Sequence, residues 1–221
     1  MSEILKKIEN RLHESIDCDV ETVSRFFKKN LNDYSYSDKF MGIKVPTLRK
    51  IAKEFIDISL QDLNFFIKSP INQIRHFALF ILIYKYQKNK VYKENEIFEF
   101  YVKNLDQVNN WNLVDASAYH ILGSFLFEKD RSFIYELAKS DDLWRKRIAI
   151  VSTYYFIKKN QFETTFEISK ILLHDSHDLI KKAIGWMLRE VGKKNEISLL
   201  NFLKEHEKEI SKVTLRYARE K

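Results

Sequence analysis

The chain is a succession of segments in which apolar residues recur with helical spacing, and the connections between segments are short. Glycine (4) and proline (2) are scarce in 221 residues, which argues against strands joined by tight turns. Short connections imply antiparallel neighbouring helices, so we predict an all-α fold. The expected helices are 3–16, 19–31, 46–57, 60–68, 71–86, 93–105, 110–128, 131–139, 142–159, 162–172, 177–193 and 196–208, with a polar loop over 32–39.

The longer helices can be placed in one register. Asn72, Asn110, Asp142 and Asp178 are matching start positions, separated by 38, 32 and 36 residues. Repeats of about this length, made of paired helices, are typical of HEAT-like α-solenoids. We therefore predict a HEAT-like helical repeat α-solenoid with a concave basic face, forming a single domain over residues 1–221. A non-repetitive helical bundle is the alternative, because identity between the repeats is weak.

Two charged residues interrupt an otherwise apolar column of this register. The fifth residue after each start is Phe77, Asp115, Arg147 and Ala183, and the eighth includes Trp186. A carboxylate and a guanidinium in an inward column are costly unless they are paired or used. Two interpretations follow: Asp115 and Arg147 belong to a functional site, or they form a buried salt bridge between adjacent repeats.

Trp111 and Asp115 lie near the expected start of the helix over 110–128, with Asn109 or Asn110 as its N-cap. They are four residues apart and therefore share one helix face. An aromatic ring attracts a cation through its quadrupole, and a carboxylate does so by charge. This arrangement suits a cationic group.

The chain is basic, with 38 Lys and Arg against 31 Asp and Glu and a net charge of +7. This balance favours a polyanionic partner, although a solvated basic surface would give the same composition. Lys44, Arg49 and Lys50 cluster around a helix start at Pro46, an arrangement that can bind phosphate.

Several classes of protein are disfavoured. Cys18 is the only cysteine, so neither an internal disulfide nor a cysteine zinc site is expected. The loop histidines His174 and His177 lack further ligands, and we expect no metal and no cofactor. The N-terminus lacks an apolar signal segment, and the longest apolar run, 77–84, is too short to cross a bilayer. We expect a cytoplasmic protein with no membrane partner. The run 154–156 (Tyr-Tyr-Phe) favours core packing over base stacking.

Four segments look familiar when read together: Gly-Ile-Lys-Val-Pro at 42–46, Asn-Trp-Asn-Leu-Val-Asp at 110–115, Leu-Trp-Arg-Lys-Arg-Ile-Ala-Ile at 143–150, and Lys-Ala-Ile-Gly-Trp-Met-Leu-Arg-Glu at 182–190. They resemble the AlkD-type DNA alkylation repair proteins, which are bacterial and archaeal HEAT-like DNA glycosylases. The resemblance runs in order from about residue 20 to residue 217.

The resemblance implies excision of cationic alkylated purines, such as 3-methyladenine and 7-methylguanine, from duplex DNA without base flipping. Asp115, Trp111 and Trp186 match the family's catalytic residues around the sugar of the lesion, and Arg147 matches an arginine that lies near them. We expect Arg147 to hold a phosphate at the lesion, because its planar guanidinium suits bidentate contact. The implied enzyme is a monomer whose partner is double-stranded DNA containing alkylated bases. The other expected DNA contacts are Lys44, Phe26, Arg49, Lys182 and Arg189.

Two positions depart from the family pattern. Phe26 stands where active relatives carry a tyrosine, so a hydroxyl contact is lost, and Lys44 stands at a polar contact position, where it can add a phosphate contact. Two other functions stay open on this scaffold. One is a non-catalytic DNA-structure-binding protein, and the other is a protein-binding solenoid.

Overall fold

The computed structural model describes residues 2–88 and 92–220. The chain divides into two compact units, residues 1–113 and 114–221, and the division falls inside helix α7 (Trp111–Ala118). Within the described ranges the only extended pairing is one isolated bridge between Lys39 and Ile71. The prediction of an all-α fold built from helical repeats is confirmed, while the single domain and the concave basic face stay predictions.

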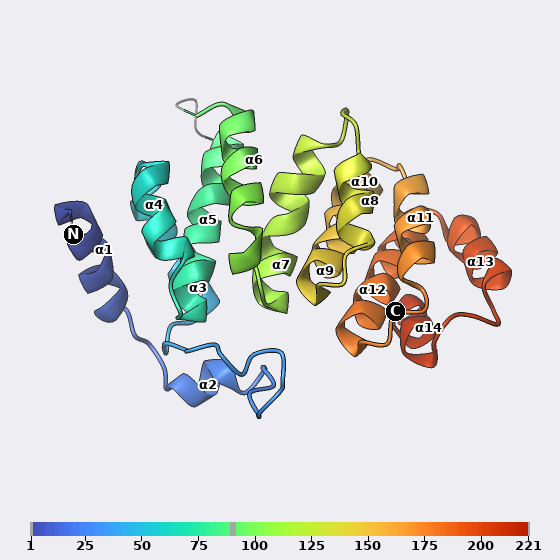
Figure 1. The fold of residues 1–221 in the computed structure, drawn as a ribbon, viewed down its shortest axis with the longest axis horizontal. Helices are drawn as coiled ribbons and strands as arrows, with labels where there is room; N and C mark the ends of the chain where they lie inside the picture. Colours follow the sequence, from blue (N-terminus) through green and yellow to red (C-terminus); the bar gives the residue numbers. More distant parts are fainter. Residues whose placement is uncertain (1, 89–91, 221) are drawn as a thin grey trace. The chain divides into compact units, whose positions relative to one another are not determined.

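The first unit is organised around α5. Every residue from Phe77 to Ile83 is buried, because α3, α4 and α6 all pack against this helix. A helix that is apolar on all sides must be covered on all sides, and Figure 1 shows α5 among these neighbours. The elements are α1 (Glu3–His13), α2 (Val20–Ser24), α3 (Val45–Glu54), α4 (Leu60–Ile67), α5 (Asn72–Lys88), α6 (Glu94–Lys103) and the 3-10 turn η1 (Leu105–Gln107).

The second unit is organised around α12, which packs against α9, α10, α11, α13 and α14. Its buried side includes Ile180, Ile184 and Leu188, which recur at helical spacing. The elements are the π-helical turn η2 (Tyr119–Gly123), α8 (Ser132–Ala138), α9 (Leu143–Ser152), α10 (Tyr154–Lys158), α11 (Glu163–Leu172), α12 (Asp178–Lys194), α13 (Glu196–Glu205) and α14 (Lys212–Arg219).

The predicted helix starts agree with the structure to within one residue. α5 begins at Asn72 and α12 at Asp178, while Asn110 and Asp142 directly precede α7 and α9. The Asp142 carboxylate accepts hydrogen bonds from the backbone N–H groups of Trp144 and Arg145. A side chain that accepts from the first free N–H groups is a local signal, which is why the sequence locates these starts well.

The helix predicted over 19–31 is wrong beyond Ser24, because α2 ends there and turns follow. The Asp33 carboxylate accepts from the backbone N–H of Asn30, and Asn32 adopts a left-handed conformation with φ of 70°. Short polar side chains compete with helical hydrogen bonding in this way. The segment 25–38 is therefore irregular, and the expected loop over 32–39 extends further toward the N-terminus.

Two other helices were predicted to be continuous but are interrupted in the structure. The helix expected over 142–159 breaks at Thr153, where the Ser152 and Thr153 hydroxyls donate to the carbonyls of Ile148 and Ile150. The helix expected over 110–128 gives way to the π-helical turn η2 after Ala118. Such turns frequently occur at functional sites.

No helix is predicted after residue 208, whereas the structure has α14 packed closely on α12. Gly185 permits this close approach. A Cβ at this position would lie 2.6 Å from the Thr214 carbonyl oxygen and 2.4 Å from the Tyr217 Cβ. The absence of a side chain at Gly185 therefore sets the distance between the two helices.

We expect Gly185→Ala to destabilise the protein by about 1–3 kcal/mol, because α14 must shift to make room. This is the net change that remains after the roughly 1 kcal/mol that alanine gains over glycine inside a helix. Gly192→Ala in the same helix is the matched control, since its Cβ would meet the flexible end of Leu199. Urea unfolding of both variants checks this, and equal stabilities would contradict the explanation.

Candidate active site

Trp111 is half-buried in the first unit and carries an aromatic neighbour on its ring. The Phe27 ring stacks on the indole with centroids 5.2 Å apart and 23° between the planes. Phe27 in turn contacts Phe40 at 4.9 Å. The Asn110 side-chain oxygen accepts a hydrogen bond of 2.8 Å from the Trp111 backbone N–H, so Asn110, one of the two predicted N-caps, satisfies the first free N–H of α7. Both the ring and the backbone of Trp111 are therefore held from within this unit.

A buried polar network lies next to this helix start and is centred on Asp38. Its carboxylate accepts from the Arg75 guanidinium at 2.6 Å, from Asn110 at 2.6 Å and from Asn72 at 3.1 Å. The Arg75 and Asp38 side chains are only 3% and 6% exposed. Asn110 therefore joins the Asp38 carboxylate on one side to the Trp111 backbone on the other.

Arg75 makes three more hydrogen bonds, to the carbonyls of Ser69 and Gln107 and to the side-chain oxygen of Asn109. These bonds connect the segment around Asp38 with the starts of α5 and α7. The sequence identified only a polar loop here, since nothing local distinguishes Asp38 from the other polar residues over 32–39. Sequence reasoning missed two residues here: Phe27, which stacks on Trp111, and Asp38, which accepts a hydrogen bond from Asn110.

In the second unit, Asp115 and Arg147 form a two-pronged ion pair. The Arg147 Nε and Nη2 donate to the two Asp115 oxygens at 2.9 and 2.8 Å, and Nη1 donates to the Leu179 carbonyl. The Arg147 side chain is 7% exposed and that of Asp115 is 22% exposed. The salt bridge between adjacent repeats, one of the two interpretations above, is therefore present, and Asp115 stays accessible within it.

Two opposing effects act on the pKa of the Asp115 carboxyl, and burial is the larger of them. Burial raises the pKa of the Asp115 carboxyl above its usual range, while the charge and hydrogen bonds of Arg147 act in the opposite direction. A carboxylate offers about four lone-pair sites, and Arg147 uses one on each oxygen. The remaining sites can accept hydrogen bonds from water. A phosphate contact by Arg147 stays a prediction, since three of its N–H groups already have partners in the protein.

An aromatic layer, which we define as Tyr119, Tyr154 and Trp186, lies on the same part of the second unit. The Tyr154 ring is 5.1 Å from Tyr119 and 5.9 Å from Trp186. Tyr119 follows Asp115 by four residues and shares its helix face, while Trp186 follows Leu179 by two helical turns. The aromatic layer therefore begins about one helical turn from Asp115, at Tyr119, and continues through Tyr154 to Trp186.

The aromatic layer corrects one prediction about the run 154–156. Phe156 is buried as expected for core packing, but Tyr154 and Tyr155 are only half-buried, and Tyr154 joins the layer. A signal for Tyr119 exists in the sequence, because it lies one turn after Asp115. Tyr154 has no such signal, since Thr153 breaks the helix before it and shifts the register.

The remaining predicted DNA contacts of the first unit are Phe26, Lys44 and Arg49, and all three are exposed. Phe26 is 62% exposed, with the Arg25 guanidinium 4.9 Å from its ring centroid. Lys44 precedes α3, and the Arg49 guanidinium lies over the Phe80 ring. Their accessibility is compatible with DNA contact, which stays a prediction.

The second unit contains Lys182 and Arg189, both on α12. The Lys182 ammonium lies 6.0 Å from the Tyr217 ring centroid. Arg189 pairs with Glu220 at 2.7 Å, so its charge is already partly neutralised. Arg189 is therefore a less available phosphate ligand than Lys182, and both contacts stay predictions.

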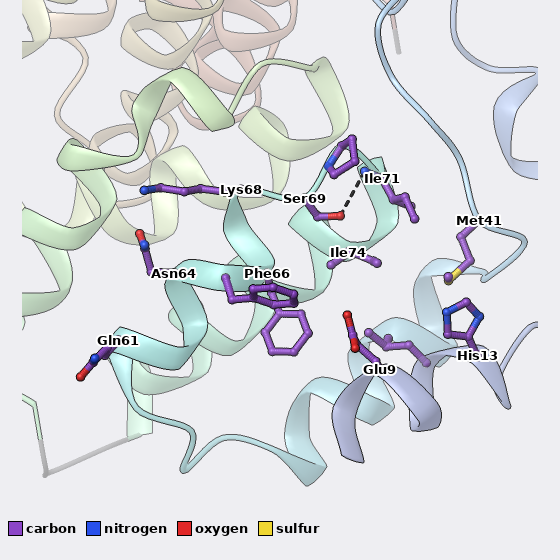
Figure 2. Close-up of a pocket in the computed structure, with 13 residues that line it drawn as sticks. Glu9, His13, Met41, Gln61, Asn64, Phe66, Lys68, Ser69, Ile71 and Ile74 are labelled. Carbon is purple, nitrogen blue, oxygen red and sulfur yellow. Dashed lines mark hydrogen bonds between the residues drawn. The ribbon is translucent and has the colours of Figure 1, made fainter. Parts of the chain in front are cut away.

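A cavity of about 650 Å³ lies in the first unit and is lined by residues of α1, α4 and the start of α5 (Figure 2). Its lining includes the apolar side chains of Met41, Phe66 and Ile74, together with Lys68 and His13. None of the predicted site residues lines it. The cavity is thus not the predicted sugar-binding site.

The described residues contain neither a cluster that could hold a metal ion nor a helix that could span a membrane. Among the described residues, no group of three or more His, Cys, Asp or Glu side chains is placed to hold a metal ion. His177 caps α12 by accepting from the Leu179 backbone N–H, and His174 lies 3.1 Å from Glu209. No helix in the described ranges is long and apolar enough to span a membrane.

Comparison with known proteins gives a family and a fold. The family model described as "DNA alkylation repair enzyme" matches residues 9–221. A solved structure described as a predicted DNA alkylation repair enzyme from Enterococcus faecalis is 17% identical, with a TM-score of 0.70, and the match covers 91% of this chain and 96% of that one.

Two solved structures from Streptococcus mutans are also similar. AlkD2 is 19% identical, with a TM-score of 0.60 and coverage of 80% of this chain and 89% of that one. The protein smu.31 is 20% identical, with a TM-score of 0.58 and coverage of 79% and 92%. At these identities the structures establish a shared fold only. A search of curated proteins finds no match.

Proposed function

Because this chain belongs to the DNA alkylation repair enzyme family, we propose that it is a DNA glycosylase for cationic alkylated purines. It would hydrolyse the N-glycosidic bond of residues such as 3-methyladenine and 7-methylguanine in duplex DNA, without flipping the base into a pocket. The observation that supports this most is the accessible Asp115 carboxylate, held by Arg147 beside the aromatic layer.

The chemistry required of such a site is modest. An alkylated purine already carries a positive charge, so the bond from C1′ to the purine nitrogen breaks with its electron pair moving to the base. The base then leaves neutral, and no general acid is needed. Positive charge develops on the sugar, and a fixed carboxylate stabilises that oxocarbenium-like transition state. Water adds to C1′ and loses its proton to Asp115 or to solvent.

Each protein group has a separate task in this proposal. Arg147 keeps the Asp115 carboxylate oriented, and its charge and hydrogen bonds oppose the rise in pKa that burial causes. Trp186 offers an aromatic surface to the cationic sugar, worth on the order of 0.5–2 kcal/mol. The family resemblance assigns the same task to Trp111. No residue here calls for a cofactor, and a monomeric, cytoplasmic enzyme stays our expectation.

We expect Asp115→Asn to lower the rate of base release by at least about tenfold, or roughly 1.4 kcal/mol, because a neutral amide cannot stabilise the sugar cation. The assay measures free 7-methylguanine released from alkylated duplex DNA by the full-length protein. Asp141→Asn, which changes an exposed carboxylate just before α9, is the matched control. Circular dichroism checks that both variants fold.

The outcomes separate three functions. Base release that depends on Asp115 supports the glycosylase. Steeply salt-dependent DNA binding with no base release from any alkylated duplex would refute it and favour a non-catalytic DNA-structure binder. No measurable DNA affinity would leave a protein-binding solenoid. The second function has one observation in its favour, namely that Arg147 already occupies both oxygens of Asp115.

A further inference from the structure

Lys158 is the last residue of α10, and its ammonium lies against aromatic rings. The Nζ atom is 4.6 Å from the ring centroid of Tyr119, 5.2 Å from that of Tyr154 and 5.6 Å from that of Tyr155. Across residues 2–88 and 92–220, no carboxylate lies within ion-pair distance of this ammonium. Lys158 is nevertheless an exposed residue, so its charge is accessible from solvent.

The positive charge of the Lys158 ammonium is therefore not balanced by a carboxylate among the described residues. Ring faces attract an ammonium, but they replace only part of the hydration that it loses on contact with them. Desolvation, followed by the nearby positive charge of Lys159, lowers the pKa of Lys158. An anion on the open side would complete the environment, because it supplies the counter-charge that the protein does not.

The position of Lys158 identifies which anion is suitable. Its ammonium contacts Tyr119 and Tyr154, and Tyr154 separates it from Trp186 in the aromatic layer. Tyr119 also shares a helix face with Asp115. A nucleotide whose sugar rests near Asp115 and Trp186 would therefore place neighbouring backbone phosphates close to Lys158.

We propose that Lys158 binds a backbone phosphate of the DNA strand that carries the lesion, with its ammonium positioned in advance by Tyr119 and Tyr154. This inference rests on the proposed function. The aromatic rings leave the ammonium little freedom, so it would define where the strand lies along the unit and would not act merely as diffuse positive charge. Lys158 thus binds the strand and fixes its position along the unit, and the Tyr119 and Tyr154 rings position the Lys158 ammonium.

The first test compares Lys158→Met with Lys159→Met on a duplex that carries a single tetrahydrofuran abasic site. Lys159 is the matched control, because among the described residues its ammonium lies near one ring only, 5.8 Å from Tyr155. We expect Lys158→Met to weaken binding roughly fivefold to tenfold near 0.1 M salt and to reduce the log–log salt slope by about 0.9. Lys158→Arg, which keeps the charge, should retain the slope.

The second test locates the phosphate. Single phosphates of the lesion strand are replaced in turn by neutral methylphosphonates, and binding is measured with wild-type protein and with Lys158→Met. At one position the replacement should weaken wild-type binding but leave Lys158→Met unaffected, as a double-mutant cycle requires of two groups in contact. Thermal unfolding of each variant shows whether a loss of binding reflects a loss of folding.

The results distinguish this inference from the function on which it rests. If wild-type protein binds and excises but Lys158→Met behaves like Lys159→Met, or if every methylphosphonate is additive with Lys158→Met, the Lys158 assignment is overturned and the glycosylase stands. If wild-type protein neither binds nor excises, both are overturned. Coupling at a single phosphate without base release would support the contact and reject the catalysis.

Discussion

Asp38→Ala is expected to lower the free energy of unfolding by about 3–5 kcal/mol, because it leaves the Arg75 charge buried without a counter-ion. The Arg75 guanidinium lies 2.6 Å from the Asp38 carboxylate, and the two side chains are only 3% and 6% exposed. Asn110 and Asn72 lose an acceptor at the same time. Chemical denaturation followed by circular dichroism measures the change.

The matched control for Asp38→Ala is Glu54→Ala, in the same unit. The Arg11–Glu54 pair has two short contacts, of 2.8 and 2.9 Å, but its side chains are 34% and 36% exposed. An exposed pair contributes less than about 1 kcal/mol, so this variant should stay close to wild type. Similar losses in the two variants would contradict the burial argument.

A double variant separates the charge effect from the lost contacts. Asp38→Ala combined with Arg75→Met removes both charges, so it should lose less stability than the sum of the two single changes. The Asp38 network also holds Asn110, which caps Trp111, so base release by the folded fraction of Asp38→Ala should fall as well. Strict additivity of the two changes would show that the pair is not coupled.

The second large effect is a dependence of stability on acid that is due to His76. This histidine is buried in α5, where its ring stacks on Phe80 and its Nδ1 faces Asn112. Burial, followed by the nearby charge of Arg49, lowers the pKa of His76 from 6.5 to about 3. The folded protein therefore keeps this ring neutral at pH values where the unfolded chain protonates it.

The sign follows from proton uptake. Because the unfolded state binds the extra proton, the contribution of His76 is fully present above about pH 6.5 and is lost as pH falls toward 3. Between pH 7 and pH 4 the loss is about 3 kcal/mol. His76→Phe cannot titrate, so its free energy of unfolding should decrease less over this range.

The measurement is urea unfolding of wild type and His76→Phe at several pH values, with His174→Gln as the control. His174 is exposed, and its replacement controls for the loss of one histidine from the chain. The phenylalanine also removes the buried Nε2, which has no hydrogen-bond partner among the residues that the structure describes, so the variant should fold. Parallel pH profiles for wild type and His76→Phe would refute the assignment.

Much of the fold was predictable because its determinants are local. Helical spacing of apolar residues and polar side chains that cap helix starts act within about one turn of the chain, so Asp142 and Asn110 were correctly identified. Breaks were harder to predict. The interruption at Thr153 depends on hydroxyl groups that bond back to carbonyls, and α14 depends on the space above Gly185.

The candidate site was predictable only in part. The sequence identified Asp115 and Arg147 as candidate site residues because charged residues are rare in an apolar column. The structure shows that they form an ion pair. The pattern did not decide between an internal ion pair and two groups facing a ligand, because both arrangements require the same residues at the same spacing. Asp38, Phe27 and Tyr154 lie in segments whose sequence predicts no site at all.

By itself, the sequence determined an all-helical repeat fold, the starts of its main helices and the charged pair of the second unit, because backbone hydrogen bonding and amphipathic spacing are properties of neighbouring residues. Only the tertiary structure decided which groups meet: Asp38 with Arg75, Phe27 with Trp111, and Lys158 with Tyr119. These contacts join segments more than twenty residues apart, and they depend on how helices pack, which local spacing does not specify.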